Sequence, residues 1–166
     1  MKFTGISDEA GQPIETQIKA HRELGWKYLE VREVDKENLT LMSDEKFEEV
    51  YRKVSESGMK VSCFGGAVGN WATKISGDFK KDFDEVKRAI PRMKKFATKY
   101  LRVMSWPNDK DNPWSDEDWG KEAIKRSKEL SKLAEDAGIV LVHENCSGWA
   151  AKTDKMLRIY REVNSP

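Results

Sequence analysis

Cysteine is scarce in this chain, and no segment at its start resembles an export signal. The 166 residues include two cysteines, Cys63 and Cys146, which excludes a fold held together by several disulfides. The first residues, MKFTGISDEAGQ, lack the apolar stretch of a signal peptide. We therefore expect a reduced, cytoplasmic protein.

Long hydrophobic runs and an excess of charge of one sign are also missing. No apolar run approaches the roughly 18 residues that a membrane-spanning helix needs. The 30 Lys and Arg residues are balanced by 29 Asp and Glu residues, for a formal net charge of +1. Proteins that bind nucleic acid through its phosphates usually carry a clearly basic face. The composition thus predicts no membrane partner and no nucleic-acid partner.

The sequence does contain a repeated alternation of short apolar runs with longer amphipathic ones. The short runs are rich in Val, Ile and aromatic residues and are bounded by Gly, Pro, Asn or Asp, which is typical of strands. They predict strands at residues 3–7, 27–31, 60–64, 100–105 and 139–144. The longer runs predict helices near residues 14–24, 44–57, 79–98, 116–137 and 152–163. Within these helices acids alternate with bases, as around Asp82, which is typical of solvated helix surface.

The ends of the predicted helices support this division. Ser43 and Ser115 are each followed by acidic residues, the pattern of an N-cap with a first turn that suits the helix dipole. Glycines separate three of the helices from the next strand, at Gly25, Gly58 and Gly138. A glycine there can take the left-handed conformation that closes a helix.

Alternating strands and helices with short returns predict parallel strands joined by right-handed crossovers. An open dinucleotide-binding sheet would show G-x-G-x-x-G after its first strand, and residues 5–11 do not supply it. The predicted loops after the third and fourth strands are long, which suits a (β/α)8 barrel with its active face at the strand C-termini. Because such a barrel has about 250 residues, we expect residues 1–166 to be the first five βα units of one barrel domain, with the C-terminal units absent.

Several charged residues fall on the predicted inner face of the strands. Side chains alternate along a strand, so Glu30 and Arg32 share one face while Leu29 and Val31 share the other. Outer faces pack on helices and should be apolar, which assigns Glu30, Arg32 and Arg102 to the interior. One interpretation is a Glu30–Arg102 ion pair, because an unpaired buried charge is costly. The other is direct substrate contact, for which Arg32, nearer the strand end, is the better candidate.

Glu144 is an acidic residue at the end of an otherwise apolar predicted strand. By alternation it faces inward, whereas His143 faces the helix layer and is interpreted as a packed residue. A carboxylate in this place can be a metal ligand, a general base or a cap for the next helix. These three roles stay open on spacing alone.

Tryptophans gather in or beside the predicted long loops, at positions 71, 106, 114, 119 and 149. Core packing explains several of them, and stacking on a sugar is the alternative for Trp106 and Trp149. Cys63 and Cys146 lie at the ends of non-neighbouring strands and are expected to be small buried side chains.

Five segments match one known family in order and spacing: ISDEA at 6–10, GWKYLEVR at 25–32, GMKVS at 58–62, YLRVMSW at 100–106 and VHENCSGW at 142–149. The chain resembles the sugar phosphate isomerase/epimerase family of xylose isomerase-like TIM barrels over essentially its whole length. The resemblance implies proton transfer on a sugar or sugar phosphate through an enediolate. It also implies a divalent ion (Mn, Mg, Co or Zn) at the C-terminal mouth of the complete barrel.

The resemblance assigns roles to a few residues. Glu144 matches the first metal ligand and one of the paired acid/base carboxylates, while Glu30 and Arg32 match the acid and the arginine of strand two. The Asp, His and second Glu ligands have no counterpart, so the metal site is incomplete and this chain alone is expected to be inactive. Epimerases of the family carry another Glu six positions after the first ligand, where this chain has Ala150.

Other functions remain open. A sugar dehydratase of the inosose dehydratase type uses the same metal frame, and a non-catalytic half-barrel module would pair with another chain. A DNA-repair endonuclease of this superfamily would need a basic groove and more ligands than two His residues allow. The first and fifth strands would be unpaired edges, which predicts self-association.

Overall fold

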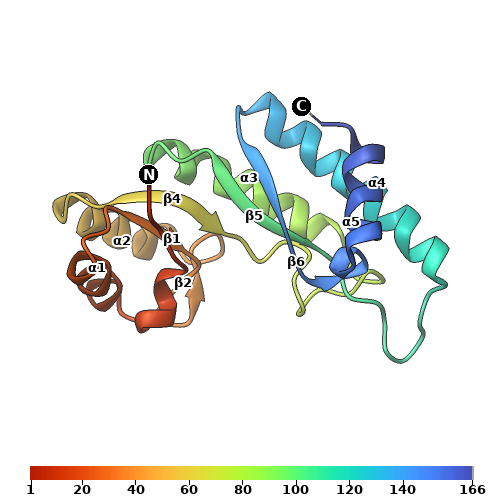
Figure 1. Ribbon diagram of the computed structural model, residues 1–166, viewed down its shortest axis with the longest axis horizontal. Coiled ribbons are helices and arrows are strands. Elements are labelled where there is room, and N and C mark those ends of the chain that lie inside the picture. The colour runs from red at the N-terminus through yellow and green to blue at the C-terminus, as the bar shows by residue number, and fades with distance from the viewer. Residues whose placement is uncertain (166) are drawn as a thin grey trace. The chain divides into compact units, whose positions relative to one another are not determined.

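Strands and helices alternate along the chain in the computed structural model, which describes residues 1–165 (Figure 1). The main strands are β1 (Tyr28–Val31), β4 (Lys60–Gly65), β5 (Tyr100–Ser105) and β6 (Val140–Gly148). Their hydrogen-bonded order is β1-β4-β5-β6. The α-helices are α1 (Ile14–Glu23), α2 (Asp44–Glu56), α3 (Lys80–Lys95), α4 (Asp116–Asp136) and α5 (Thr153–Val163), joined by the short helices η1 (Ser7–Ala10) and η2 (Trp149–Ala151).

Strand β1 confirms the predicted parallel pairing and the predicted alternation of faces. It runs parallel to β4, with Tyr28 opposite Lys60 and Val31 opposite Phe64. Leu29 and Val31 are fully buried, whereas Tyr28 and Glu30 are only half-buried. The apolar side chains of β1 therefore pack in the core and its polar ones lie on the other face.

The first predicted strand, at residues 3–7, is wrong. Only Ile6 forms a bridge, to Glu30, and the chain turns directly into η1 at Ser7. The extended run before this turn is short, and Phe3 within it is exposed, so little apolar burial holds it as a strand.

The hairpin formed by β2 (Glu33–Val34) and β3 (Glu37–Asn38), which pair antiparallel, has no counterpart among the elements predicted from the sequence. Its turn residues Asp35 and Lys36 have φ of 51° and 66°, as a type I′ turn requires at both central positions. Such turns favour Asn-Gly or Asp-Gly, and the Asp-Lys pair carries no comparable signal.

The helix ends agree with the prediction. The Ser43 and Ser115 hydroxyls accept hydrogen bonds from the backbone N–H groups of Lys46 and Asp118. Left-handed glycines close the helices as expected, with φ between 71° and 72° at Gly25, Gly58 and Gly138.

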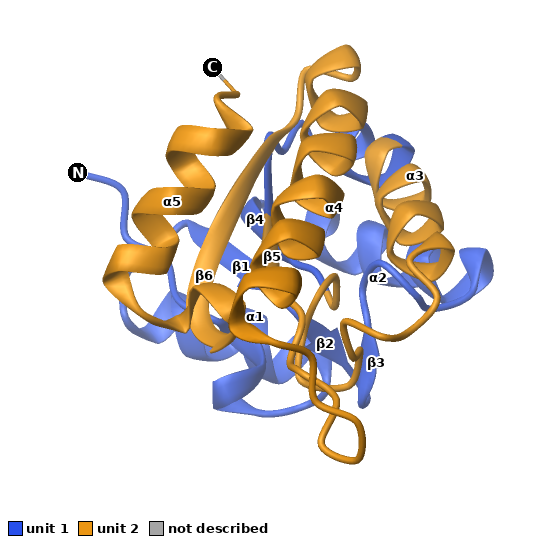
Figure 2. Cartoon of the chain, turned by 90° about the vertical axis from the view of Figure 1, so that its right-hand side faces the viewer, with its two compact units in different colours: residues 1–66, 91–101 blue, residues 67–90, 102–166 orange. Residues whose placement is uncertain are grey.

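The chain folds as two compact units (Figure 2). Unit 1 comprises residues 1–66 and 91–101, and unit 2 comprises residues 67–90 and those from 102 onward. In unit 1 the ring of Phe96 packs edge-on against Phe47, Tyr51 and Phe64. In unit 2 the largest buried side chains include Trp106, Ile75 and Leu130.

Within residues 1–165, none of the helices is both long enough and apolar enough to cross a membrane.

Candidate functional site

Opposite charges on β5 and β6 meet within unit 2. Nη1 of Arg102 lies 3.1 Å from Oε2 of Glu144, and the Glu144 side chain is 33% exposed while Arg102 is buried. This contact is an ion pair without hydrogen-bond geometry. Oε2 of Glu144 therefore has no hydrogen-bond partner among the described residues, and Nε of Arg102 has none there either. The pair thus presents a partly exposed carboxylate beside a buried cation.

The sequence predicted Glu144 at the end of a strand, but it lies inside β6. Strand β6 continues to Gly148 because Ser105 holds its last residues: the Ser105 hydroxyl donates to the Ser147 carbonyl at 3.2 Å and accepts from the Ala150 N–H at 2.9 Å. Both cysteines were predicted to be buried. Cys63 is buried, but Cys146 lies near the end of the longer strand and is exposed.

His143 lies on the helix side of β6, as expected from alternation. Its Nδ1 is 2.9 Å from Sδ of Met156 in α5. Burial lowers the pKa of His143 to about 4, because an apolar environment disfavours the charged imidazolium. The ring is therefore a neutral, packed group.

Trp106 follows β5 and is buried at 1% exposure. Its Nε1 donates to Oδ2 of Asp82 at 2.9 Å, and Oδ1 of Asp82 accepts the Gly69 N–H at 3.0 Å. Asp82 is itself buried, so the prediction that it lies on a solvated helix surface is wrong. Burial raises the pKa of the Asp82 carboxyl although both donors favour the charged form.

Trp149 is packed in a similar way, at 2% exposure. Its Nε1 donates to the Asp116 carbonyl at 3.1 Å, and the charged groups of Lys155 and Arg158 each lie 5.4 Å from its ring centre. Both tryptophans thus have structural contacts in unit 2. Their contact with a substrate stays a prediction.

In unit 1 a carboxylate cluster holds Arg32. Its Nε and Nη2 donate to Oδ2 of Asp8 at 2.9 and 2.7 Å, and Nη2 also donates to Oε1 of Glu9 at 2.9 Å. Burial alone would lower the pKa of Arg32, but the two carboxylates raise it above its ordinary value. Asp8 is buried, and its Oδ1 has no hydrogen-bond partner among the described residues.

Asp8 belongs to the ISDEA segment, yet nothing in that segment indicated that its carboxylate would hold Arg32. Glu30 is half-buried, its N–H donates to the Gly5 carbonyl and its carbonyl accepts the Ser7 hydroxyl. The predicted Glu30–Arg102 pair joins residues of different units and stays a prediction.

The residues present do not make a metal centre. Within residues 1–165, no three His, Cys, Asp or Glu side chains gather where they could hold an ion. Oε2 of Glu144 is buried without a hydrogen bond, but it already pairs with Arg102, and no other ligand joins it among the described residues. One carboxylate beside a cation does not fit a tightly bound divalent ion.

Solved structures of the same fold cover most or all of the chain. The probable 3-DHS dehydratase from Bacillus anthracis is 15% identical, with a TM-score of 0.74, over 100% of this chain and 60% of its own. The 3-keto-D-glucoside 4-epimerase of E. coli is 16% identical, with a TM-score of 0.72, over 100% and 66%. A xylose isomerase-like TIM barrel protein from Mycobacterium smegmatis, solved in complex with magnesium, is 18% identical, with a TM-score of 0.69, over 94% and 55%.

These identities are low, so the likeness shows the fold: an α/β structure with a parallel sheet that forms part of a TIM barrel. The chain spans 55–66% of the length of these three structures. No curated protein sequence matches it. A family model described as the xylose isomerase-like TIM barrel matches residues 18–166, which confirms the resemblance drawn from the sequence. The chain belongs to the xylose isomerase-like TIM barrel family.

Proposed function

We propose that this chain is part of a sugar or sugar phosphate isomerase or epimerase, in which Glu144 moves a proton at a carbon next to a carbonyl. The observation that carries the proposal is the Arg102–Glu144 pair of unit 2. A carboxylate whose side chain is partly exposed can accept a proton from a bound substrate, provided that it is held in one place. Arg102, itself buried, supplies that support.

The reaction would proceed through an enediolate. Glu144 takes the proton from the carbon beside the carbonyl. Return of a proton to the other face of the same carbon gives the epimer. Return of a proton to the neighbouring carbon, together with transfer of the hydroxyl proton to the former carbonyl oxygen, gives the isomer. Glu30 and Arg32 of unit 1 and Trp106 and Trp149 of unit 2 are our candidates for substrate contact. Glu144 alone does not hold a divalent ion, and the described residues supply no further ligands.

Solvent exchange tests the proposal directly. Incubation of the chain with ketohexoses and their phosphates in deuterium oxide should place deuterium on the carbon next to the carbonyl, as followed by NMR. Glu144→Gln cannot accept a proton and should lower the exchange rate at least about 100-fold, the lower limit of general-base contributions. Glu129→Gln, at an exposed position of α4, is the matched control and should exchange as the wild type does.

Equal exchange in wild type and Glu144→Gln would contradict the role of Glu144. A chain that exchanges no substrate, while remaining folded, would favour the non-catalytic half-barrel module.

A sugar dehydratase is the second candidate, because the described residues offer a single suitable carboxylate. One carboxylate is enough for this reaction, because the proton that it removes from the carbon can be passed to the hydroxyl group, which then leaves from the next carbon as water. Dehydration gives a conjugated product that absorbs in the ultraviolet, whereas isomerisation and epimerisation do not. Absorbance and product NMR therefore separate the two reactions.

A further inference from the structure

Trp71 is the most exposed tryptophan of the chain. It lies in the loop between β4 and α3 and is 63% exposed, whereas the other five tryptophans are buried or half-buried. Large aromatic rings usually pack in a core or in an interface. The indole of Trp71 instead leaves most of its apolar surface in contact with solvent.

The backbone on both sides of Trp71 is fixed by its neighbour Asn70. The Ala72 N–H donates to Oδ1 of Asn70 at 2.8 Å, and the Thr73 N–H donates to the Asn70 carbonyl at 3.1 Å. Asn70 is itself buried. Trp71 therefore projects from a closed turn, and a ligand that contacts its ring does not have to order the loop first.

The same loop is attached to the C-terminal end of β5, within unit 2. The Trp106 N–H donates to the Gly69 carbonyl at 2.8 Å, and the Ile75 N–H donates to the Pro107 carbonyl at 2.8 Å. In TIM barrels the substrate sites lie at the C-terminal ends of the strands. Trp71 thus lies on a loop at the end of the strands where a substrate is expected.

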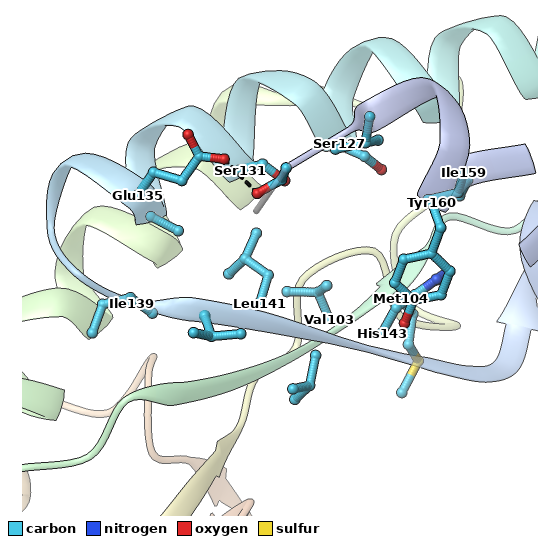
Figure 3. A pocket seen from close by; sticks show the side chains of 15 residues that line it. Val103, Met104, Ser127, Ser131, Glu135, Ile139, Leu141, His143, Ile159 and Tyr160 are labelled. Carbon is cyan, nitrogen blue, oxygen red and sulfur yellow. Dashed lines mark hydrogen bonds between the residues drawn. The ribbon is translucent and has the colours of Figure 1, made fainter. Parts of the chain in front are cut away.

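A cavity of about 380 Å³ in unit 2 lies elsewhere, between β6 and the helices α4 and α5 (Figure 3). Residues of β6 as far as His143 line it, and Glu144 is not among its lining residues. A sugar held for proton transfer at Glu144 therefore needs contacts outside this cavity.

The charges beside Trp71 indicate what kind of ligand its ring can take. Lys74 is the only charged residue among residues 67–77. Its Nζ lies 3.1 Å from Oδ1 of Asp109 and 3.5 Å from Oδ2 of Asp111. Two carboxylates outweigh one ammonium group, so the loop offers no free cation to a phosphate and suits a neutral ligand.

We propose that Trp71 is a stacking surface for a neutral sugar. The C–H groups on one face of a sugar ring are apolar and pack against the negative face of the indole, while the hydroxyls remain hydrated. The choice of a sugar as ligand rests on the proposed function. The residue and the preference for an uncharged sugar go beyond it.

Iodide quenching of tryptophan fluorescence in the full chain, at constant ionic strength, tests this contact. Iodide reaches exposed indoles and is kept from buried ones, so Trp71 should account for most of the quenching, and Trp71→Phe should lose that part. D-Fructose should protect the wild type from iodide, whereas mannitol, an open-chain polyol with as many carbon atoms, should not. D-Fructose 6-phosphate should bind no more tightly than D-fructose.

Trp71→Leu removes the ring and should raise the Kd of D-fructose, followed by amide NMR, at least about fivefold, as expected for the loss of one aromatic contact. Trp71→Phe keeps a ring and should weaken binding less. Tyr160→Leu is the matched control, because Tyr160 is a similarly exposed aromatic residue of unit 2 that lines the cavity of Figure 3. This variant should bind D-fructose as the wild type does.

Unchanged iodide quenching in D-fructose, or equal affinities of the wild type and Trp71→Leu, would overturn the proposal. Loss of binding in Tyr160→Leu alone would place the sugar in the cavity and overturn it as well, and tighter binding of the phosphate would overturn the preference for a neutral sugar. Protection of Trp71 without deuterium exchange would contradict the proposed reaction and support this inference. Deuterium exchange without protection would do the reverse.

Discussion

Asp82 is a buried carboxylate that joins three segments of unit 2. It lies in α3, accepts the Gly69 N–H from the loop after β4, and accepts Nε1–H from Trp106 after β5. Gly69 has φ of 64°, and a Cβ there would lie 2.5 Å from the Met104 carbonyl oxygen, so only glycine fits this close approach. The carboxylate and the glycine together fix the loop at the end of the strands.

We expect Asp82 to make stability depend on pH. Its pKa is raised in the folded chain, mainly by burial, so the folded state binds the proton more tightly than the unfolded state. Its contribution to the free energy of unfolding must then decrease as pH rises from the ordinary carboxyl pKa through the raised one, and stay constant above it. Asp82→Asn removes this titration, so the stability of the wild type relative to the variant should fall with rising pH over that window.

Urea denaturation at a series of pH values measures this difference. Asp84→Asn is the control on the same helix. Asp84 is exposed, and its hydrogen bond with Lys80 lowers its pKa. Any change with pH in the stability difference between the wild type and Asp84→Asn should therefore have the opposite sign. A pH-independent difference between wild type and Asp82→Asn would show that burial does not raise the pKa of Asp82.

At the scale of elements, Gly120 explains how α4 and η2 pack. Glycine inside a helix costs about 1 kcal/mol relative to alanine, yet Gly120 lies within α4. An added Cβ would lie 2.4 Å from Cζ2 of Trp149 in η2. The Trp149 ring therefore occupies the space that a side chain at position 120 would need.

Gly120→Ala should destabilise the chain by about 1–3 kcal/mol, the usual cost of overpacking, although alanine is the better helix former. The same substitution in a Trp149→Phe background should cost less, because the smaller ring leaves space for the methyl group. Chemical denaturation of the four proteins of this double-mutant cycle gives the coupling. A stabilising Gly120→Ala in the wild-type background would contradict the packing described above.

The sequence predicted most elements because their signals are local. Serine caps, left-handed glycines and periodic apolar faces act within a few residues, and α2, α4 and β5 lie within one residue of their predicted bounds. One wrongly predicted strand and one missed hairpin also have local reasons. Residues 3–7 bury too little apolar surface to form a strand, and the hairpin was missed because its turn at Asp35 and Lys36 lacks glycine.

At the scale of the whole molecule, β6 is the last strand in the hydrogen-bonded order. An edge strand presents unpaired backbone groups that can pair with another chain, and Val140 on β6 is 44% exposed. We propose that two copies of the chain associate through β6. This is the self-association expected from the sequence.

Val140→Lys should weaken this association, because a charged side chain on an edge strand opposes pairing. Light scattering over a range of concentrations should show wild-type oligomers that the substitution shifts toward monomer. Leu157→Lys changes an exposed apolar residue of α5 and should leave association unchanged. A wild type that is monomeric at every concentration would contradict the proposal, and an effect confined to Leu157→Lys would place the contact on the helix.

The sequence by itself determined the parallel α/β architecture and the family, because both follow from periodicity, caps and spacing that neighbouring residues set. It also placed Glu144 and Arg102 on strands. Only the tertiary structure decided that these two side chains pair, that Asp82 and Trp106 are buried together, and that Arg32 is held by Asp8. Each of those contacts joins residues more than 20 positions apart, where the burial of one side chain depends on a partner that no local pattern reveals.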